Sequence, residues 1–123
     1  MSEDLLTKVM LVEDDESMKA VLGTLLEIEG YKVLLAPDRR PLEEIVQAIR
    51  EAVPDVILID VNLRQVSGYD ILKAVREDPF LAKTRIVMSS GMDTREQCLA
   101  EGADEFLLKP YMPDELLVKL KGL

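Results

Sequence analysis

Residues 56–60 have the sequence VILID, four apolar residues in a row followed by a carboxylate. A strand with apolar side chains on both faces is typical of the centre of a parallel sheet, because helices cover both sides of such a sheet. A second apolar run, residues 9–12, is followed by acids at positions 13–15, and a third, residues 106–108, is followed by Lys109. We therefore expect these polar side chains to meet at the carboxyl ends of parallel strands, where ligands bind in open α/β sheets.

Around the central strand, short apolar runs alternate with amphipathic segments, which predicts a doubly wound parallel α/β sheet with right-handed crossovers. We expect strands over residues 8–12, 31–36, 55–59, 85–89 and 104–108, and helices over residues 15–29, 41–52, 69–77, 94–101 and 112–120. Most of the apolar residues of the first helix are expected in the core, with Met18 as the member that can face a partner. These residues are Met18, Val21, Leu22, Leu25, Leu26 and Ile28.

The composition describes one domain over residues 1–123, with 48% hydrophobic residues and a net charge of −9. The acidic balance argues against contact with nucleic acid or an anionic membrane, because binding phosphates needs clustered cations, and no apolar run approaches the ~20 residues of a membrane span. The single cysteine, Cys98, allows no intramolecular disulfide, so we expect a reducing compartment, the cytoplasm. The absence of histidine excludes a Ser-His-Asp triad and argues against the usual zinc sites.

The carboxylates of Glu13, Asp14 and Asp60 would repel one another at a shared sheet edge unless a cation lay between them. Mg²⁺ suits such a place, because it takes oxygen ligands and commonly uses one or two carboxylates together with waters. The acids at positions 13–15 can instead cap the next helix, where the positive end of the helix dipole favours acids. Both interpretations stay open, and Asp15 is the best candidate for a cap.

Asp60 and Lys109 can carry phosphoryl chemistry. The Asp60 carboxylate can act as a nucleophile toward phosphorus, giving an acyl phosphate, although Asp is also common in the turns that end strands. The Lys109 ammonium can pair with Asp60 or with a bound phosphoryl group, although lysines at strand ends are usually ordinary solvated residues. Pro110 after it allows a cis peptide bond at a cost of only ~0.5–1 kcal/mol.

Ser90 and Gly91 end the fourth predicted strand at the same edge. The Ser90 hydroxyl can hydrogen-bond a phosphoryl oxygen, and Gly91 can bring its backbone N–H close to one. An ordinary turn explains the two residues equally well.

Taken in order along the chain, these residues resemble the receiver domain of two-component response regulators. The resemblance covers residues 9–120 and rests on Val12-Glu13-Asp14-Asp15, Asp60 with Gly68 eight residues on, Ser90, Gly102-Ala103-Asp104 and Lys109-Pro110. It implies a flavodoxin-like fold, with five strands in the order 2-1-3-4-5 and five helices.

The resemblance also implies roles at the sheet edge. It implies that Asp60 is phosphorylated and that Mg²⁺ is bound by Asp14, by Asp60 and by the backbone carbonyl of Asn62. Glu13 would act on the ion largely through water.

Further roles follow from the same resemblance. Lys109 and Ser90 would contact the phosphoryl group, together with Gly91. Ser90 and Phe106 would act as switch residues that change the surface of the fourth helix and fifth strand on phosphorylation.

The implied function is signalling by a domain that phosphorylates and dephosphorylates itself rather than turning over a substrate. A histidine kinase or a histidine phosphotransfer protein would donate the phosphoryl group, and a downstream effector protein would respond. The domain would be a monomer or a phosphorylation-dependent dimer, and would stand alone or form the N-terminal receiver of a longer regulator.

Two departures from the family pattern keep other functions open. Arg64 stands where most members have proline, and the stretch from Ser90 to Lys109 is short, so we expect a truncated fourth helix. A degenerate receiver that binds partners constitutively is therefore an alternative. A phosphatase of the haloacid dehalogenase type would need a second Asp where Asn62 stands. Residues 38–41, DRRP, form either a docking segment for a partner or a solvated loop.

Overall fold

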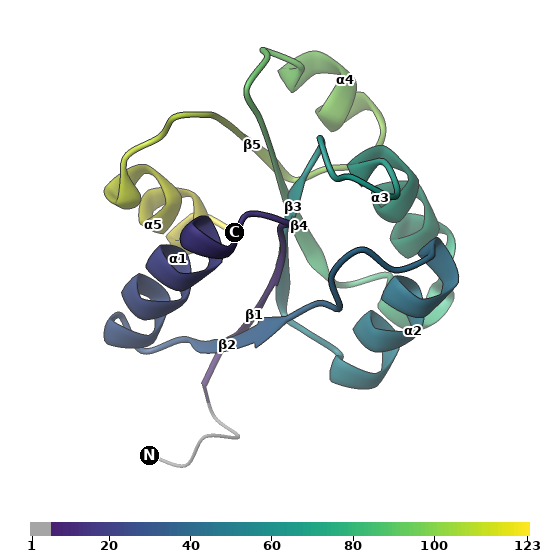
Figure 1. The fold of residues 1–123 in the computed structure, drawn as a ribbon, viewed down its shortest axis with the longest axis horizontal. Helices are drawn as coiled ribbons and strands as arrows, with labels where there is room; N and C mark the ends of the chain where they lie inside the picture. The colour runs from purple at the N-terminus through teal and green to yellow at the C-terminus, as the bar shows by residue number, and fades with distance from the viewer. Residues whose placement is uncertain (1–5) are drawn as a thin grey trace.

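The computed structural model describes residues 6–123, and within them five parallel strands form one sheet in the order β2-β1-β3-β4-β5 (Figure 1). The strands are β1 (Lys8–Val12), β2 (Lys32–Leu35), β3 (Val56–Asp60), β4 (Arg85–Ser90) and β5 (Glu105–Leu108). The predicted α/β fold and its strand order are confirmed. Asp60 and Ser90 are the last residues of their strands, so both stand at the carboxyl edge of the sheet.

Helices cover both faces of the sheet (Figure 1). They are α1 (Glu16–Ile28), α2 (Leu42–Ala52), α3 (Gly68–Glu77), α4 (Arg95–Ala100) and α5 (Pro113–Lys121), with a short 3₁₀ helix, η2 (Pro79–Leu81), that the sequence did not predict. Helices α1 and α5 pack on one face, and α2, α3 and α4 on the other. None of the helices in the described part of the chain is long and apolar enough to cross a membrane.

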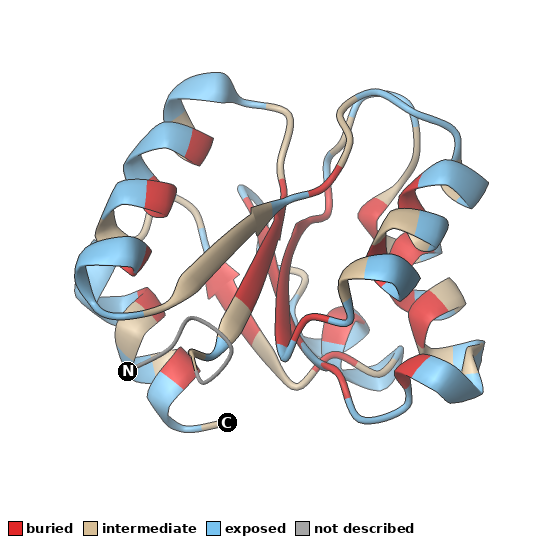
Figure 2. Ribbon diagram, turned by 90° about the horizontal axis from the view of Figure 1, so that it is seen from below, coloured by how far each residue is buried: buried red, intermediate tan, exposed pale blue. Residues whose placement is uncertain are grey.

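The core confirms the central position of β3, whose five residues are all buried (Figure 2). Val56 and Leu58 pack toward α1 and α5, whereas Ile57 and Ile59 pack toward α2 and α3. Side chains of a strand alternate between its two faces, so one unbroken apolar run supplies both cores.

Helix α1 differs from the sequence-based expectation in which side chains it buries. Val21 and Ile28 are 59% and 76% exposed, whereas Lys19 is buried together with Leu22 and Leu26. Positions 19, 22 and 26 share one side of a helix with 3.6 residues per turn, while positions 21 and 28 lie about half a turn away. The assignment of Val21 and Ile28 to the core was therefore wrong. Met18 is partly buried and packs against the core of this face.

Val53, at the C-terminal end of α2, has the left-handed conformation, with φ 45° and ψ 61°. A β-branched residue is strained there, and Val53 is 44% exposed, so the burial lost with its side chain is only partial. We expect Val53→Gly to raise the free energy of unfolding by about 1 kcal/mol, measured by urea denaturation. Val53→Ala retains a Cβ, and equal stabilisation by it would contradict strain as the cause.

Candidate functional site

Glu13, Asp60 and Lys109 meet at the carboxyl edge of the sheet, although they follow three different strands. The Lys109 ammonium donates to Glu13 Oε1 at 2.8 Å and to Asp60 Oδ2 at 3.0 Å. The side chains of Glu13 and Asp60 are 9% and 10% exposed, and the side chain of Lys109 is 23% exposed. Lysine is long enough to reach from the end of β5 past β4 to β3, and its charge offsets two nearly buried carboxylates.

These two partners favour the charged form of Lys109. Burial acts to lower the pKa of Lys109, but the hydrogen bonds to Glu13 and Asp60 outweigh it, so the pKa lies above its usual value. The Lys109-Pro110 peptide bond is cis. Beside it, burial raises the pKa of Tyr111 to about 12, so this phenol stays protonated at neutral pH.

The backbone around Asp60 is closely packed. The Asn62 N–H donates to Asp60 Oδ1 at 3.0 Å, and the Gly68 N–H donates to the Val61 carbonyl at 3.0 Å. A Cβ atom at Gly68 would clash with the Asp60 carbonyl oxygen and lie 2.8 Å from Val61 Cα. Gly68 is therefore needed for the start of α3 to lie against the end of β3.

Asp14 has a different hydrogen-bond partner. Its Oδ2 accepts a hydrogen bond of 2.6 Å from the Arg64 backbone N–H. Burial raises the pKa of Asp14, the Arg64 N–H opposes that rise, and the neighbouring Asp38 carboxyl group adds to it. Asp38 comes from the loop between β2 and α2, and the sequence predicted it only as part of a docking segment or a solvated loop. The other acid, Asp15, caps α1 by accepting from the Met18 N–H at 3.0 Å, as the capping interpretation predicted.

Ser90 lies at the end of β4, next to the Asp60 loop. Its hydroxyl oxygen accepts from the Met92 N–H at 3.1 Å and from the Asn62 side-chain amide at 3.3 Å. Gly91 follows in an exposed position, and a Cβ there would meet no atom within 4 Å. The space beside the Gly91 Cα is therefore open.

Phe106, the predicted switch aromatic, is only 5% exposed. It lies opposite Met88 in the register of β4 and β5, on the face covered by α2, α3 and α4. Its ring is therefore part of the core directly below α4.

Oxygen donors at this edge suit a hard divalent cation. In residues 6–123, no three Asp, Glu, His or Cys side chains are gathered into a metal-binding group, since Glu13 is directed to Lys109 and to the Asp14 and Asp15 N–H groups. Mg²⁺ nevertheless needs only one or two carboxylates and keeps several waters. The Asp14 and Asp60 carboxylates, with the Asn62 backbone carbonyl, fit that requirement.

Comparison with known proteins agrees with this fold. Residues 9–121 match the family model of the response regulator receiver domain. A solved structure of the chemotaxis response regulator CheY4 of Vibrio cholerae has a TM-score of 0.84 at 31% identity, covering 95% of this chain and 98% of that one. The receiver domain of the sensor histidine kinase PA1611 of Pseudomonas aeruginosa, described with magnesium in its active-site cleft, has a TM-score of 0.81 at 25% identity, covering 95% and 96%.

The chain belongs to the response regulator receiver domain family of two-component signalling. A curated relative, the phosphate regulon transcriptional regulatory protein PhoB of Rhizobium meliloti, is 30% identical over 97% of this chain and 52% of its own length. The probable transcriptional regulator ycf27 of Guillardia theta is 29% identical over 94% of this chain and 44% of its own length. The chain thus spans about half the length of these two relatives.

Proposed function

We propose that residues 1–123 act as one receiver domain that accepts a phosphoryl group on Asp60 with the help of Mg²⁺. The donor would be a histidine kinase or a histidine phosphotransfer protein, and the receiver would signal to a protein effector. The observation that carries this proposal is the Lys109 ammonium within 3.0 Å of Asp60 at the carboxyl edge of the sheet. Cys98 is free and buried, which fits the reducing cytoplasm.

The acceptor chemistry needs little beyond positioning. An Asp60 carboxylate oxygen attacks the phosphorus of phosphohistidine, an O–P bond forms, and the N–P bond breaks with its electron pair going to the imidazole. The Asn62 N–H and the Lys109 ammonium fix the orientation of the Asp60 carboxylate. Lys109 can then pair with a phosphoryl oxygen.

Asp14, Asp60 and the Asn62 backbone carbonyl would bind Mg²⁺. When bound, the ion supplies positive charge that offsets the negative charge on the phosphoryl oxygens. Glu13 would contribute mainly by keeping Lys109 charged and in place, because it lies 2.8 Å from the Lys109 ammonium.

The proposed switch begins at Ser90. Its hydroxyl oxygen acts as acceptor in both described bonds, so the hydroxyl proton is available to a phosphoryl oxygen on Asp60. A shift of Ser90 would move the β4–α4 segment, and Phe106 below α4 would adjust with it. Apolar side chains are already exposed on α4 and β5, the elements whose surface would change: Leu99 and Leu108.

The test is the intact mass after incubation with Mg²⁺ and acetyl phosphate. We expect wild type to gain one phosphoryl group only when Mg²⁺ is present, and Asp60→Asn to gain none, because an amide is not a nucleophile for phosphorus. Asp70→Asn, at an exposed position in the first turn of α3, is the matched control and should be phosphorylated like wild type. Incorporation into Asp60→Asn at the normal rate would show that another residue is the acceptor.

A further inference from the structure

Lys19 is a charged residue on the buried side of α1. Its side chain is 9% exposed, and its ammonium lies 2.9 Å from Glu16 Oε1 and 3.4 Å from Asp38 Oδ2. Burying a lysine costs free energy unless it is paired, and Glu16, 80% exposed, is a solvated partner. Asp38, with a side chain 29% exposed, is the more shielded of the two partners.

Asp38 uses only one of its two carboxylate oxygens in this pair. The other, Oδ1, is buried and accepts from no N–H or hydroxyl group in the described part of the chain. The Asp38 carboxyl group lies within hydrogen-bonding reach of the Asp14 carboxyl group, and this contact lowers the pKa of Asp38. A buried acceptor without a donor is costly, and such atoms commonly mark a bound water or ion.

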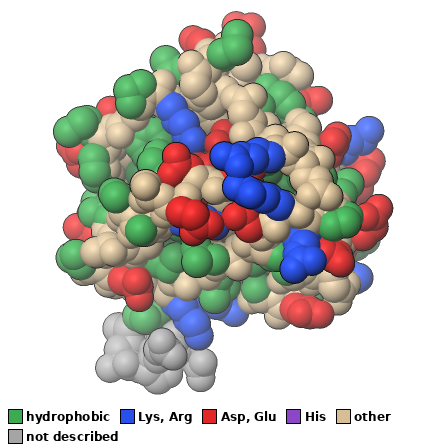
Figure 3. All heavy atoms as spheres, in the orientation of Figure 1, with side chains coloured by type: hydrophobic (Ala, Val, Ile, Leu, Met, Phe, Trp, Pro, Cys, Tyr) green, Lys and Arg blue, Asp and Glu red, His purple; other side chains and the backbone are tan. Residues whose placement is uncertain are grey.

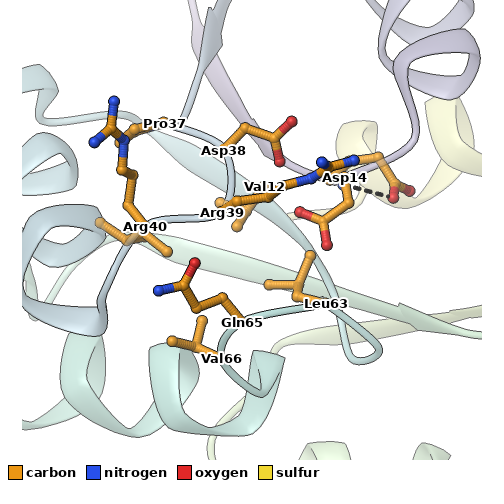
Figure 4. A pocket seen from close by; sticks show the side chains of 11 residues that line it. Val12, Asp14, Pro37, Asp38, Arg39, Arg40, Leu63, Gln65 and Val66 are labelled. Atoms are coloured by element: carbon orange, nitrogen blue, oxygen red, sulfur yellow. Dashed lines mark hydrogen bonds between the residues drawn. The ribbon is translucent and has the colours of Figure 1, made fainter.

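A small cavity lies beside Asp38 and Asp14 (Figure 4). Its volume is about 10 Å³, which approaches the space needed by a single water molecule. The side chain of Asp14 reaches it from the loop after β1, and that of Asp38 from the loop after β2. Figure 3, drawn in the orientation of Figure 1, shows acidic and basic side chains gathered at the centre of the face in view.

We propose that Asp38, held by Lys19, is a positioning residue of the Mg²⁺ site: its free oxygen accepts a hydrogen bond from a water carried by the ion and thereby orients Asp14. This inference rests on the proposed function, because it assumes that Asp14 binds Mg²⁺. Mg²⁺ keeps several of its waters in proteins, and groups that bind the ligands of a metal rather than the metal itself tune its affinity. The arrangement also explains why a lysine is buried at this point of α1.

The test is the dissociation constant for Mg²⁺, measured by isothermal titration calorimetry on the unphosphorylated chain. We expect Asp38→Asn to weaken Mg²⁺ binding about tenfold. Asparagine has the shape of aspartate and is well tolerated in loops, so the variant should unfold at nearly the wild-type temperature in the presence of a chelator.

Glu16→Gln is the matched control, because it also removes one negative charge and one partner of Lys19. Asp38 could instead affect Mg²⁺ binding only through its negative charge, or only by pairing with Lys19. In either case Glu16→Gln would weaken Mg²⁺ binding to the same degree. We expect less than a twofold change for Glu16→Gln, and equal effects of the two variants would overturn the proposal.

Asp14→Asn separates this proposal from the proposed function. Wild-type binding of Mg²⁺ that is lost in Asp14→Asn, but unchanged in Asp38→Asn, would refute the role of Asp38 and leave the metal site standing. No binding of Mg²⁺ to wild type would refute both the metal site and the role of Asp38.

Discussion

Lys109→Met is expected to lower the free energy of unfolding by about 3 kcal/mol in the absence of Mg²⁺. The change leaves the carboxylates of Glu13 and Asp60, which are 9% and 10% exposed, without the cation that pairs with both. Methionine has nearly the length of lysine, so the loss comes from the charge rather than from a cavity. Urea denaturation with a chelator present measures the effect.

Mg²⁺ should recover part of the stability lost in this variant. An ion that binds the folded state stabilises it by mass action, and two uncompensated carboxylates should bind Mg²⁺ more tightly than a pair whose charge Lys109 already offsets in part. We therefore expect millimolar Mg²⁺ to stabilise Lys109→Met more than wild type. The intact-mass assay should nevertheless show little phosphoryl group on the variant, because no ammonium remains to pair with it.

Lys119→Met is the matched control, because Lys119 also forms a close ion pair, 2.9 Å from Glu105 Oε1. The side chains of that pair are 30% and 25% exposed, so water screens the charges that remain. The expected cost is about 0–1 kcal/mol. A loss as large as that of Lys109→Met would contradict burial of the carboxylates as the cause.

The strand ends were predictable from the sequence because apolar runs are local signals. The run at residues 56–60 fixes the centre of the sheet, and parallel strands bring their carboxyl ends to one edge. That reasoning brings Asp60, Glu13 and Lys109 together, and the contacts of 2.8 and 3.0 Å agree with it. The chemical roles of these residues remain predictions until phosphorylation is measured.

The contact between Lys19 and Asp38 was not predicted, because it joins a helix face to a loop through tertiary packing. A signal was nevertheless present: Lys19 lies at helical spacing from Leu22 and Leu26, on the side that had to face the core. A lysine on a core stripe indicates a buried acidic partner. The partner itself could not be identified without the fold, because Asp38 looks like an ordinary loop residue.

The position of the charge repulsion also depended on the fold. The sequence suggested that Asp60 would be repelled by the acids after β1, but Lys109 lies 3.0 Å from its carboxylate. The carboxylate that is repelled is instead Asp14, whose pKa is raised by burial and by the nearby Asp38 carboxyl group. The lysine therefore relieves one acid, and the other is left for a cation to relieve.

Gly68→Ala is expected to damage both the fold and the acceptor, because the added Cβ would clash with the Asp60 carbonyl oxygen and lie 2.8 Å from Val61 Cα. Backbone atoms cannot move aside as a flexible side chain can, so β3 and α3 must separate. We expect a loss of about 1–3 kcal/mol in the free energy of unfolding. Phosphorylation of Asp60 should slow by up to about 10²-fold, the effect of a displacement near 1 Å.

Gly23→Ala provides the opposite case in the same protein. Gly23 is a buried residue inside α1, and a Cβ there would meet only Val33 Cγ1, at an ordinary contact distance of 3.9 Å. Alanine favours a helix interior over glycine by about 0.5–1 kcal/mol, so this variant should be more stable than wild type and be phosphorylated normally. If Gly68→Ala were equally well tolerated, the close approach of α3 to Asp60 would not be what positions the acceptor, and the hydrogen bonds from Asn62 and Lys109 alone would have to hold it.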